Sequence, residues 1–121
     1  MIITNTDFEK EFQELNNIYT MRNPKKIHEF IKENEGLLKL LNETHPYLIS
    51  KFPNGEFELQ AHEDITGEGY HKIYINIFVD DETFNNGFMD GIHEIHEKII
   101  PIEKEMNLMM KMILMPGIKG Y

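Results

Sequence analysis

Residues 70–80 read Tyr-His-Lys-Ile-Tyr-Ile-Asn-Ile-Phe-Val-Asp, and this stretch decides the fold. Branched apolar side chains recur in it at every second position: Ile73, Ile75, Ile77 and Val79. Alternate side chains of a pleated strand share one face, so the stretch predicts a strand with one continuous apolar face. Its other positions carry no charge: Tyr74, Asn76 and Phe78. We therefore expect the second face to meet protein as well, which means a sheet that needs cover on both sides.

A shorter strand comes before this one in the sequence. After a turn at residues 52–55, apolar residues again alternate with polar ones: Phe57, Leu59 and Ala61. An antiparallel hairpin with Leu59 opposite Ile75 brings both apolar sets onto one face, and this fixes the register. The same register sends His62 and His71 to opposite faces, which argues against a metal site built from this pair of histidines.

Three helical patterns precede the hairpin. A capping box opens the first helix, which covers about residues 6–20. Asn23-Pro24 is the start signal of a second helix over residues 24–33, and a leucine-rich pattern predicts a third over residues 37–52. Pro46 lies inside the third helix, and we expect a kink or a short break there because proline removes a backbone donor.

One long helix is expected after the central strand. Thr83 is its predicted N-cap, and the helix covers residues 84–100 with an apolar seam of Phe84, Phe88, Ile92, Ile95 and Ile99. Gly87 and Gly91 fall inside it and weaken it, which suggests that something packs closely there. Pro101 is expected to kink or end this helix.

The final apolar run, Leu108–Met115, fits either a strand or a helix. Its short length before Pro116 favours a strand that joins the same sheet. The sequence thus predicts a single α+β domain over residues 1–121: N-terminal helices, an antiparallel β-hairpin, a long helix and a C-terminal strand, in the order ααα-ββ-α-β.

The composition is that of an acidic globular protein with a formal net charge of -9. Acidic residues number 21 against 12 basic ones, and Arg22 is the only arginine, which disfavours nucleic acid and favours a more basic protein as a partner. The absence of cysteine excludes disulfides, thiolate metal sites and cysteine nucleophiles. Neither a membrane span nor a leader pattern is visible, so we expect a cytoplasmic protein with no membrane partner. The preference for Lys over Arg is typical of an AT-rich prokaryotic genome.

The pattern Leu37-Leu38-x-Leu40-Leu41-x-Glu43-x-x-Pro46-x-Leu48 leads to Phe52-Pro53, then to a short alternating strand and a second strand that ends in acids. Over residues 37–80 the chain resembles a group of small uncharacterised prokaryotic proteins with a leucine-rich helix, a Phe-Pro turn and a β-hairpin. The resemblance implies an ααββαβ order and brings no catalytic residues with it.

A stripe of potential metal ligands lies on the predicted helix over residues 84–100. At about 100° per residue, Asp90, His93 and Glu97 fall within roughly 60° of one another, so they could chelate a divalent metal such as zinc. The favoured interpretation is a solvated acidic face, because such faces with scattered histidines are common. We therefore expect no cofactor, with a divalent metal as the alternative.

Other candidate sites have simpler interpretations. The acids at residues 80–82 suit the first turn of a helix better than an active site. The methionines near the C-terminus are expected to fill the core, and the alternative interpretation is an adaptable contact surface. Ser50 is the only serine and has no glycine elbow around it, so we predict no catalytic residues.

The leading functional hypothesis is a protein-interaction or regulatory accessory module, and the alternative is a metal-dependent enzyme or metal-binding protein. The second face of the sheet would carry the contact residues: Tyr74, Phe78, Met109, Ile113 and Met115. The favoured expectation is that the helix with Phe8 and Tyr19 covers this face within the chain. The other hypothesis is a symmetric homodimer that buries it.

Overall fold

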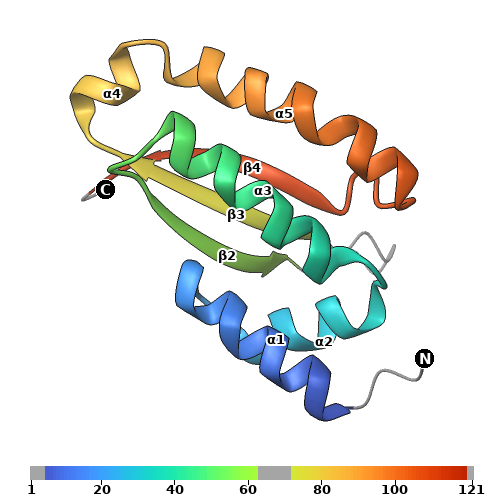
Figure 1. The fold of residues 1–121 in the computed structure, drawn as a ribbon. Coiled ribbons are helices and arrows are strands. Elements are labelled where there is room, and N and C mark those ends of the chain that lie inside the picture. Colours follow the sequence, from blue (N-terminus) through green and yellow to red (C-terminus); the bar gives the residue numbers. More distant parts are fainter. Residues whose placement is uncertain (1–4, 63–71, 120–121) are drawn as a thin grey trace.

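The structure, a computed structural model, describes residues 5–62 and 72–119. Its elements follow in the order α1 (Asn5–Ile18), β1 (Thr20–Met21), α2 (Pro24–Glu33), α3 (Leu37–Lys51), β2 (Glu56–His62), β3 (Lys72–Val79), α4 (Asp81–Asn85), α5 (Phe88–Glu105) and β4 (Met112–Ile118) (Figure 1). Within the described residues these helices accompany one four-stranded sheet. The predicted α+β class, with the last strand in the same sheet as the hairpin, is confirmed.

The sheet has the strand order β1-β2-β3-β4. β2 and β3 are antiparallel, whereas the two outer strands each run parallel to their neighbour. Leu59 lies opposite Ile75, as the alternation of apolar residues predicted, and His62 lies opposite Lys72. The register is strongly specified because a slip of one residue would turn every apolar side chain to the other face. The prediction for His71 falls outside the described residues.

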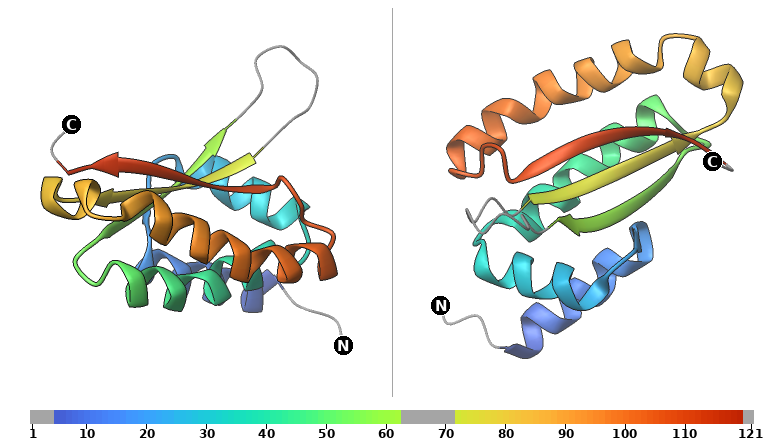
Figure 2. Two further views of the ribbon diagram at one scale, coloured as in Figure 1. Left: turned by 90° about the horizontal axis from the view of Figure 1, so that it is seen from above. Right: turned by 180° about the vertical axis from the view of Figure 1, so that it is seen from behind.

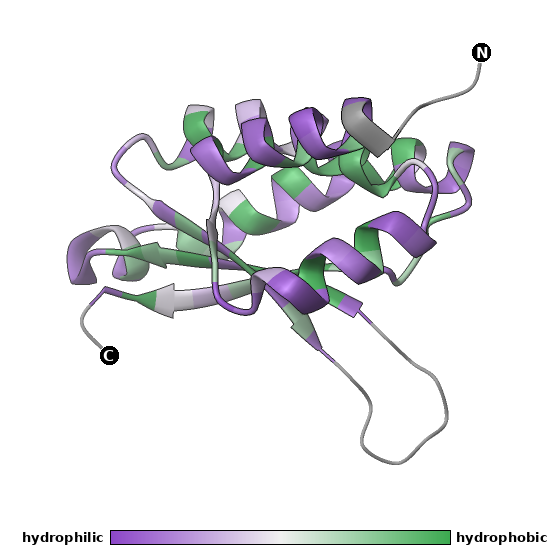
Figure 3. Ribbon diagram, turned by 90° about the horizontal axis from the view of Figure 1, so that it is seen from below, coloured by the Kyte–Doolittle hydropathy of each residue, from purple (hydrophilic) through white to green (hydrophobic). Residues whose placement is uncertain are grey.

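The helices of residues 5–62 and 72–119 cover one face of this sheet. α1, α3 and α5 lie together on one side of it, while α2 lies beside β2 at the edge (Figure 2). Apolar residues occupy the sides of these helices that are turned toward the sheet and toward one another (Figure 3). The Tyr19 hydroxyl, buried at the end of α1, donates to the Leu41 carbonyl of α3 at 2.8 Å, which ties the two helices together.

The position of α1 corrects one expectation. The helix with Phe8 and Tyr19 packs against α3 on the covered side, so it does not lie over the second face. The chain before β2 returns to the sheet through β1, which pairs parallel to β2. That short strand was not predicted, and it follows directly after α1 in the chain.

Two prolines lie inside continuous helices, so the break and the helix end that were expected as alternatives to a kink do not occur. α3 includes Pro46, and α5 continues past Pro101 to Glu105. Both proline side chains are exposed, so each ring is on the solvent side, where water can satisfy the freed carbonyl. Burial of the opposite side of each helix outweighs the lost hydrogen bond.

The predicted helix over residues 84–100 is in fact two helices. Asp80, and not Thr83, is the N-cap of the short α4, because its carboxylate accepts from the Thr83 N–H at 2.8 Å. Gly87 then adopts a φ of 83°, which glycine reaches without strain, and α5 begins at the next residue. Gly91 is buried inside α5, where a Cβ would lie 2.9 Å from the Phe52 ring. The close packing expected at Gly91 is thus confirmed, whereas the same expectation for Gly87 is wrong, since no described atom lies within 4 Å of a Cβ built there.

The C-terminal strand begins and ends later than predicted, because residues 108–111 form a turn and β4 covers Met112–Ile118. Pro116, taken as a stop signal, lies inside the strand. The Lys111 carbonyl accepts from Ile73 and the Lys119 N–H donates to Val79, so odd-numbered residues of β4 bond to β3. The even-numbered Pro116 therefore faces the outer edge, where its missing N–H costs no bond within the sheet.

Candidate functional site

The sheet side chains that point away from α1, α3 and α5 form one surface, which we call the open face. Alternation along each strand assigns to it Thr20 of β1, Glu56, Glu58, Gln60 and His62 of β2, Lys72, Tyr74, Asn76 and Phe78 of β3, and Ile113, Met115 and Gly117 of β4. In the view from behind, no helix of residues 5–62 and 72–119 lies in front of these strands (Figure 2). In the described part of the chain, this mixed polar and apolar surface therefore has no helix layer over it.

An apolar strip follows β3 and β4 across the open face, and it consists of Tyr74, Phe78, Ile113 and Met115. In the register of the two strands, Tyr74 lies beside Ile113 and Phe78 lies beside Gly117. A Cβ at position 117 would come within 2.8 Å of the Phe78 ring, so the ring lies directly over the glycine backbone. Met115 is 39% exposed. The strip thus offers flat aromatic and flexible thioether surface.

The polar centre of the open face is internally satisfied. The Asn76 side-chain amide donates to Glu58 Oε1 at 3.0 Å and to Gln60 Oε1 at 3.1 Å. Arg22, which follows β1, lies 4.0 Å from the same Glu58 oxygen. Because these groups already have partners, covering them costs less free energy than covering unpaired ones would.

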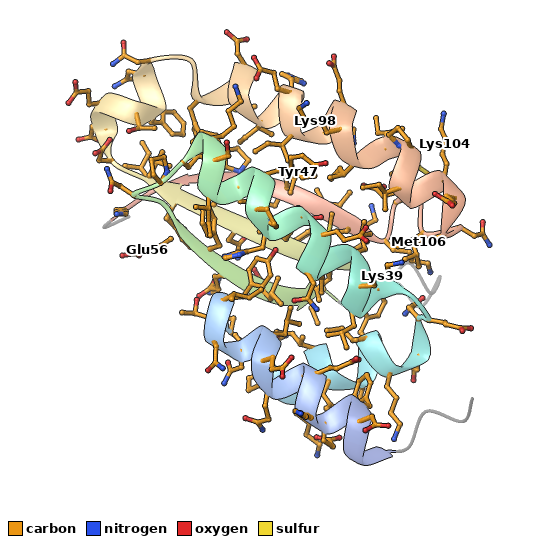
Figure 4. The ribbon with its side chains drawn as sticks, in the orientation of Figure 1. Lys39, Tyr47, Glu56, Lys98, Lys104 and Met106 are labelled. Carbon is orange, nitrogen blue, oxygen red and sulfur yellow. The ribbon has the colours of Figure 1, made fainter. Side chains whose placement is uncertain are left out.

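Charged side chains lie at both ends of the strands of the open face. Glu56 begins β2 and points outward (Figure 4), while Lys72 and His62 lie at the other end of the β2–β3 pair. The His62 ring stacks on Tyr74 with centroids 5.2 Å apart. Near the Glu56 end, the Lys119 ammonium donates to the Asn54 carbonyl at 2.6 Å and is thereby held at the turn before β2.

Four of the five predicted contact residues lie together in the apolar strip, and Met109 does not. Met109 is 41% exposed in the turn before β4, because the strand starts at Met112. Its neighbour Met110 is 61% exposed and has a φ of 68°, a conformation that costs a non-glycine residue energy. Neither methionine fills the core as predicted, whereas Met112 does.

No protein-family model, curated protein or solved structure matches the chain. The resemblance over residues 37–80 therefore stays a prediction. No helix in the described part of the chain is both long and apolar enough to span a membrane.

The predicted metal ligands Asp90, His93 and Glu97 are exposed on α5. Within residues 5–62 and 72–119, no three histidine, aspartate or glutamate side chains are placed so that they could hold a metal ion together. Glu94, which lies between His93 and Glu97 in the sequence, forms an ion pair with Lys51 of α3. The hydrogen bond from Lys51 lowers the pKa of the Glu94 carboxyl. Part of the acidic face of α5 therefore helps to attach the helix to α3. Metal binding there stays an untested alternative.

We expect excess zinc to leave the melting temperature of the protein unchanged, because His93 and Glu97 are not gathered with a third ligand in the described residues. The measurement is thermal unfolding of the parent and of the His93→Ala, Glu97→Ala double variant, each with and without zinc. A ligand that binds the native state raises its melting temperature. A zinc-dependent rise in the parent that the double variant loses would establish a metal site.

A shallow hollow of about 380 Å³ lies between the end of α1, α3 and the start of β2. His45 lines it, with its ring edge-on to Tyr19 at 5.2 Å and to Phe57 at 6.0 Å. Burial lowers the pKa of His45, and a hydrogen bond to the Ile18 backbone acts in the opposite direction. No periodic pattern of the sequence singles out this residue. The ring of His45, a residue of α3, contacts Tyr19 at the end of α1 and Phe57 of β2, so it packs these three elements together.

The acids at residues 80–82 serve the start of α4. Asp80 caps the helix, and its hydrogen bonds with Thr83 lower the pKa of the carboxyl. Asp81 and Glu82 follow in the first turn, where negative charge suits the helix dipole.

Glu103 was missed by sequence reasoning. Its side chain is 2% exposed, and Oε1 has no hydrogen-bond partner in the described part of the chain. Burial raises the pKa of this carboxyl. A signal was available, because Glu103 follows Ile99 by four residues and so continues the buried seam of α5.

Proposed function

We propose that the chain is a protein-interaction module of accessory or regulatory character, and that it binds a partner protein through the open face. One observation supports the proposal: the apolar strip lies on a sheet face that no helix of the described residues covers. Exposed apolar patches with polar rims are typical of interaction sites, and tyrosine, phenylalanine and methionine are enriched in interface cores. The proposal assigns no catalytic residue.

Two further properties of the open face fit this proposal. The hydrogen bonds from Asn76 to Glu58 and Gln60 keep the polar centre paired when water is removed. Met115 can adjust its rotamer to a partner surface, since its side chain is unbranched and partly exposed.

Native mass spectrometry of the protein isolated from its own cells tests the proposal. We expect the parent in an assembly larger than one chain and the Met115→Lys variant as a free chain, because a lysine in the apolar strip must be desolvated on binding. The matched control is Met89→Lys on α5, since Met89 is 46% exposed and receives the same change. Equal thermal unfolding of the two variants would show that both fold.

The control should keep the parental assembly. A parent that is isolated only as a single chain would contradict the proposal. A Met115→Lys variant that keeps all parental assemblies would contradict it as well.

A further inference from the structure

We infer that the hollow between α1, α3 and β2 is a binding site for a primary ammonium group carried on a hydrocarbon stem, as in an alkylamine or a lysine side chain. The hollow lies at the edge of the sheet and shares Thr20 and Glu56 with the open face. The inference goes beyond the proposed function and does not depend on it. It follows from the charge, the hydrogen-bond acceptors and the apolar walls of the hollow.

A carboxylate without a counter-charge lines the hollow. Glu56 forms no ion pair or hydrogen bond in the described part of the chain, and no lysine or arginine is among the described residues that line the hollow. Lys119 reaches the same turn, but its ammonium is bonded to the Asn54 carbonyl, and neither residue lines the hollow. Arg22 lies against Glu58, further along β2. An entering cation therefore meets an unpaired carboxylate.

His45 supplies a hydrogen-bond acceptor in the wall of the hollow. Its ring donates one N–H to the Ile18 backbone carbonyl, so the second ring nitrogen is the one that can accept. Burial lowers the pKa of His45, and at pH 7 the neutral ring keeps this lone pair. No described residue donates to it. An ammonium group has only N–H donors, so it matches a wall that offers a lone pair and a carboxylate.

The end of α1 adds negative potential at the same place. Its last turn carries no basic side chain. The last carbonyls of a helix have no partner within it, and the helix dipole places about half a negative charge there. Asn16 and Asn17 belong to this turn and line the hollow. Together with Glu56 and His45, this helix end makes a cation the ligand that fits.

The remaining walls are apolar, which favours an organic cation over a metal ion. Ile49 of α3 is 46% exposed and lines the hollow together with Pro53, and Tyr19 and Phe57 contribute aromatic surface. Each methylene group that a ligand buries against such walls strengthens its binding. The volume of about 380 Å³ is at the lower end of the range for small-molecule sites.

Titration of the isotope-labelled full chain with n-butylammonium chloride, followed by NMR at low salt, tests the inference. We expect saturable shifts of the backbone amide signals of Thr20, His45 and Phe57. n-Butanol has the same stem without the charge, and ammonium chloride has the charge without the stem. Each should bind at least about fivefold more weakly than n-butylammonium, because each lacks one of the two contributions.

Glu56→Gln keeps the shape of the side chain and removes its charge. This variant should bind n-butylammonium about fivefold more weakly or worse, because a hydrogen bond to a carboxylate is stronger than one to a neutral amide. Glu97→Gln, the same change on the exposed side of α5, is the matched control and should keep the parental affinity. Both positions are exposed, so both variants should unfold at the parental temperature.

His45→Phe tests the acceptor separately. A phenyl ring can keep the edge-on contacts with Tyr19 and Phe57, but it has no lone pair to offer. We expect weaker binding of n-butylammonium in a variant whose NMR signals away from the hollow stay in their parental positions.

Three results would overturn the inference: no saturable shift at the residues of the hollow, equal binding of n-butanol, or undiminished affinity in Glu56→Gln. A second titration, with Nα-acetyl-lysine methylamide, identifies the source of the ammonium group. Binding at least as tight as that of n-butylammonium supports a lysine side chain of a protein, and weaker binding supports a free amine. Because these titrations use the chain alone, their failure leaves the proposed partner of the open face untouched.

Discussion

Ile75→Ala is expected to lower the free energy of unfolding by about 2–5 kcal/mol, the range for truncation of a fully buried large side chain. Ile75 is 0% exposed in β3 and lies between Leu59 of β2 and Leu114 of β4. Removal of its branched side chain leaves a cavity at the centre of the covered face, where strands on both sides limit collapse. Domains of this size are commonly stable by 5–15 kcal/mol, so the loss is a large share of the total.

The comparison variant is Tyr74→Ala, which truncates the neighbouring residue on the open face. Tyr74 is only partly buried, so its truncation should cost less than that of Ile75. Urea titrations of both variants measure the two costs. A larger loss for Tyr74→Ala would mean that the faces of the central strand are exchanged.

Glu103→Met is expected to raise the free energy of unfolding at pH 7 by about 1–3 kcal/mol, the usual cost of a buried polar group without a partner. The carboxyl of Glu103 is buried, and its Oε1 has no hydrogen-bond partner in the described residues. Methionine has a similar length and flexibility, and it removes the need to desolvate a charge.

The sign of the pH dependence follows from the raised pKa of Glu103. In the unfolded chain the pKa of the carboxyl is about 4.3. Between that value and the raised pKa, the folded chain binds more protons than the unfolded chain, so this group makes stability fall as pH rises. The advantage of Glu103→Met should therefore be largest at neutral pH and smallest near pH 4.

Urea titrations of the parent and Glu103→Met across this range measure the difference. Glu103→Gln is the control, because it keeps the shape and polarity of the side chain and removes the titration. Its stability should show none of the pH dependence assigned to Glu103. A gain for Glu103→Met that is equal at pH 4 and pH 7 would contradict the assignment.

The hairpin could be predicted in detail because its signal has period two on both strands. Leu59 and Ile75 each belong to an apolar set that only one register places on one face, and the structure has that register. Local sequence signals predicted the ends of the helices and the short strand β1 less accurately. Pro101 and Pro46 do not end their helices, since burial along the opposite side of each helix outweighs one lost backbone bond. β1 has two residues, too few for any periodic pattern.

The open face was only half predictable. Tyr74 and Phe78 showed that the second face of β3 is neither fully polar nor fully apolar. Which face the first helix covers depends on β1, and a two-residue pairing leaves no trace in the sequence pattern. His45 was missed because its environment comes from α1, α3 and β2, which are distant in the chain. Glu103 was missed because the predicted helix ended at Pro101, although its spacing from Ile99 continues the buried seam of α5.

Neither outer strand of the sheet is well suited to pair with a strand of another molecule, and this matters at high protein concentration. On the outer edge of β4, Pro116 offers no N–H to an incoming strand, and the opposite edge at β1 is only two residues long. A sheet that grows strand by strand from molecule to molecule, as in amyloid fibrils, needs a long row of unpaired backbone groups. Within residues 5–62 and 72–119, Pro116 interrupts the row on one edge and the other edge has two residues, so neither edge offers a long continuous template for fibre growth beside the exposed apolar face.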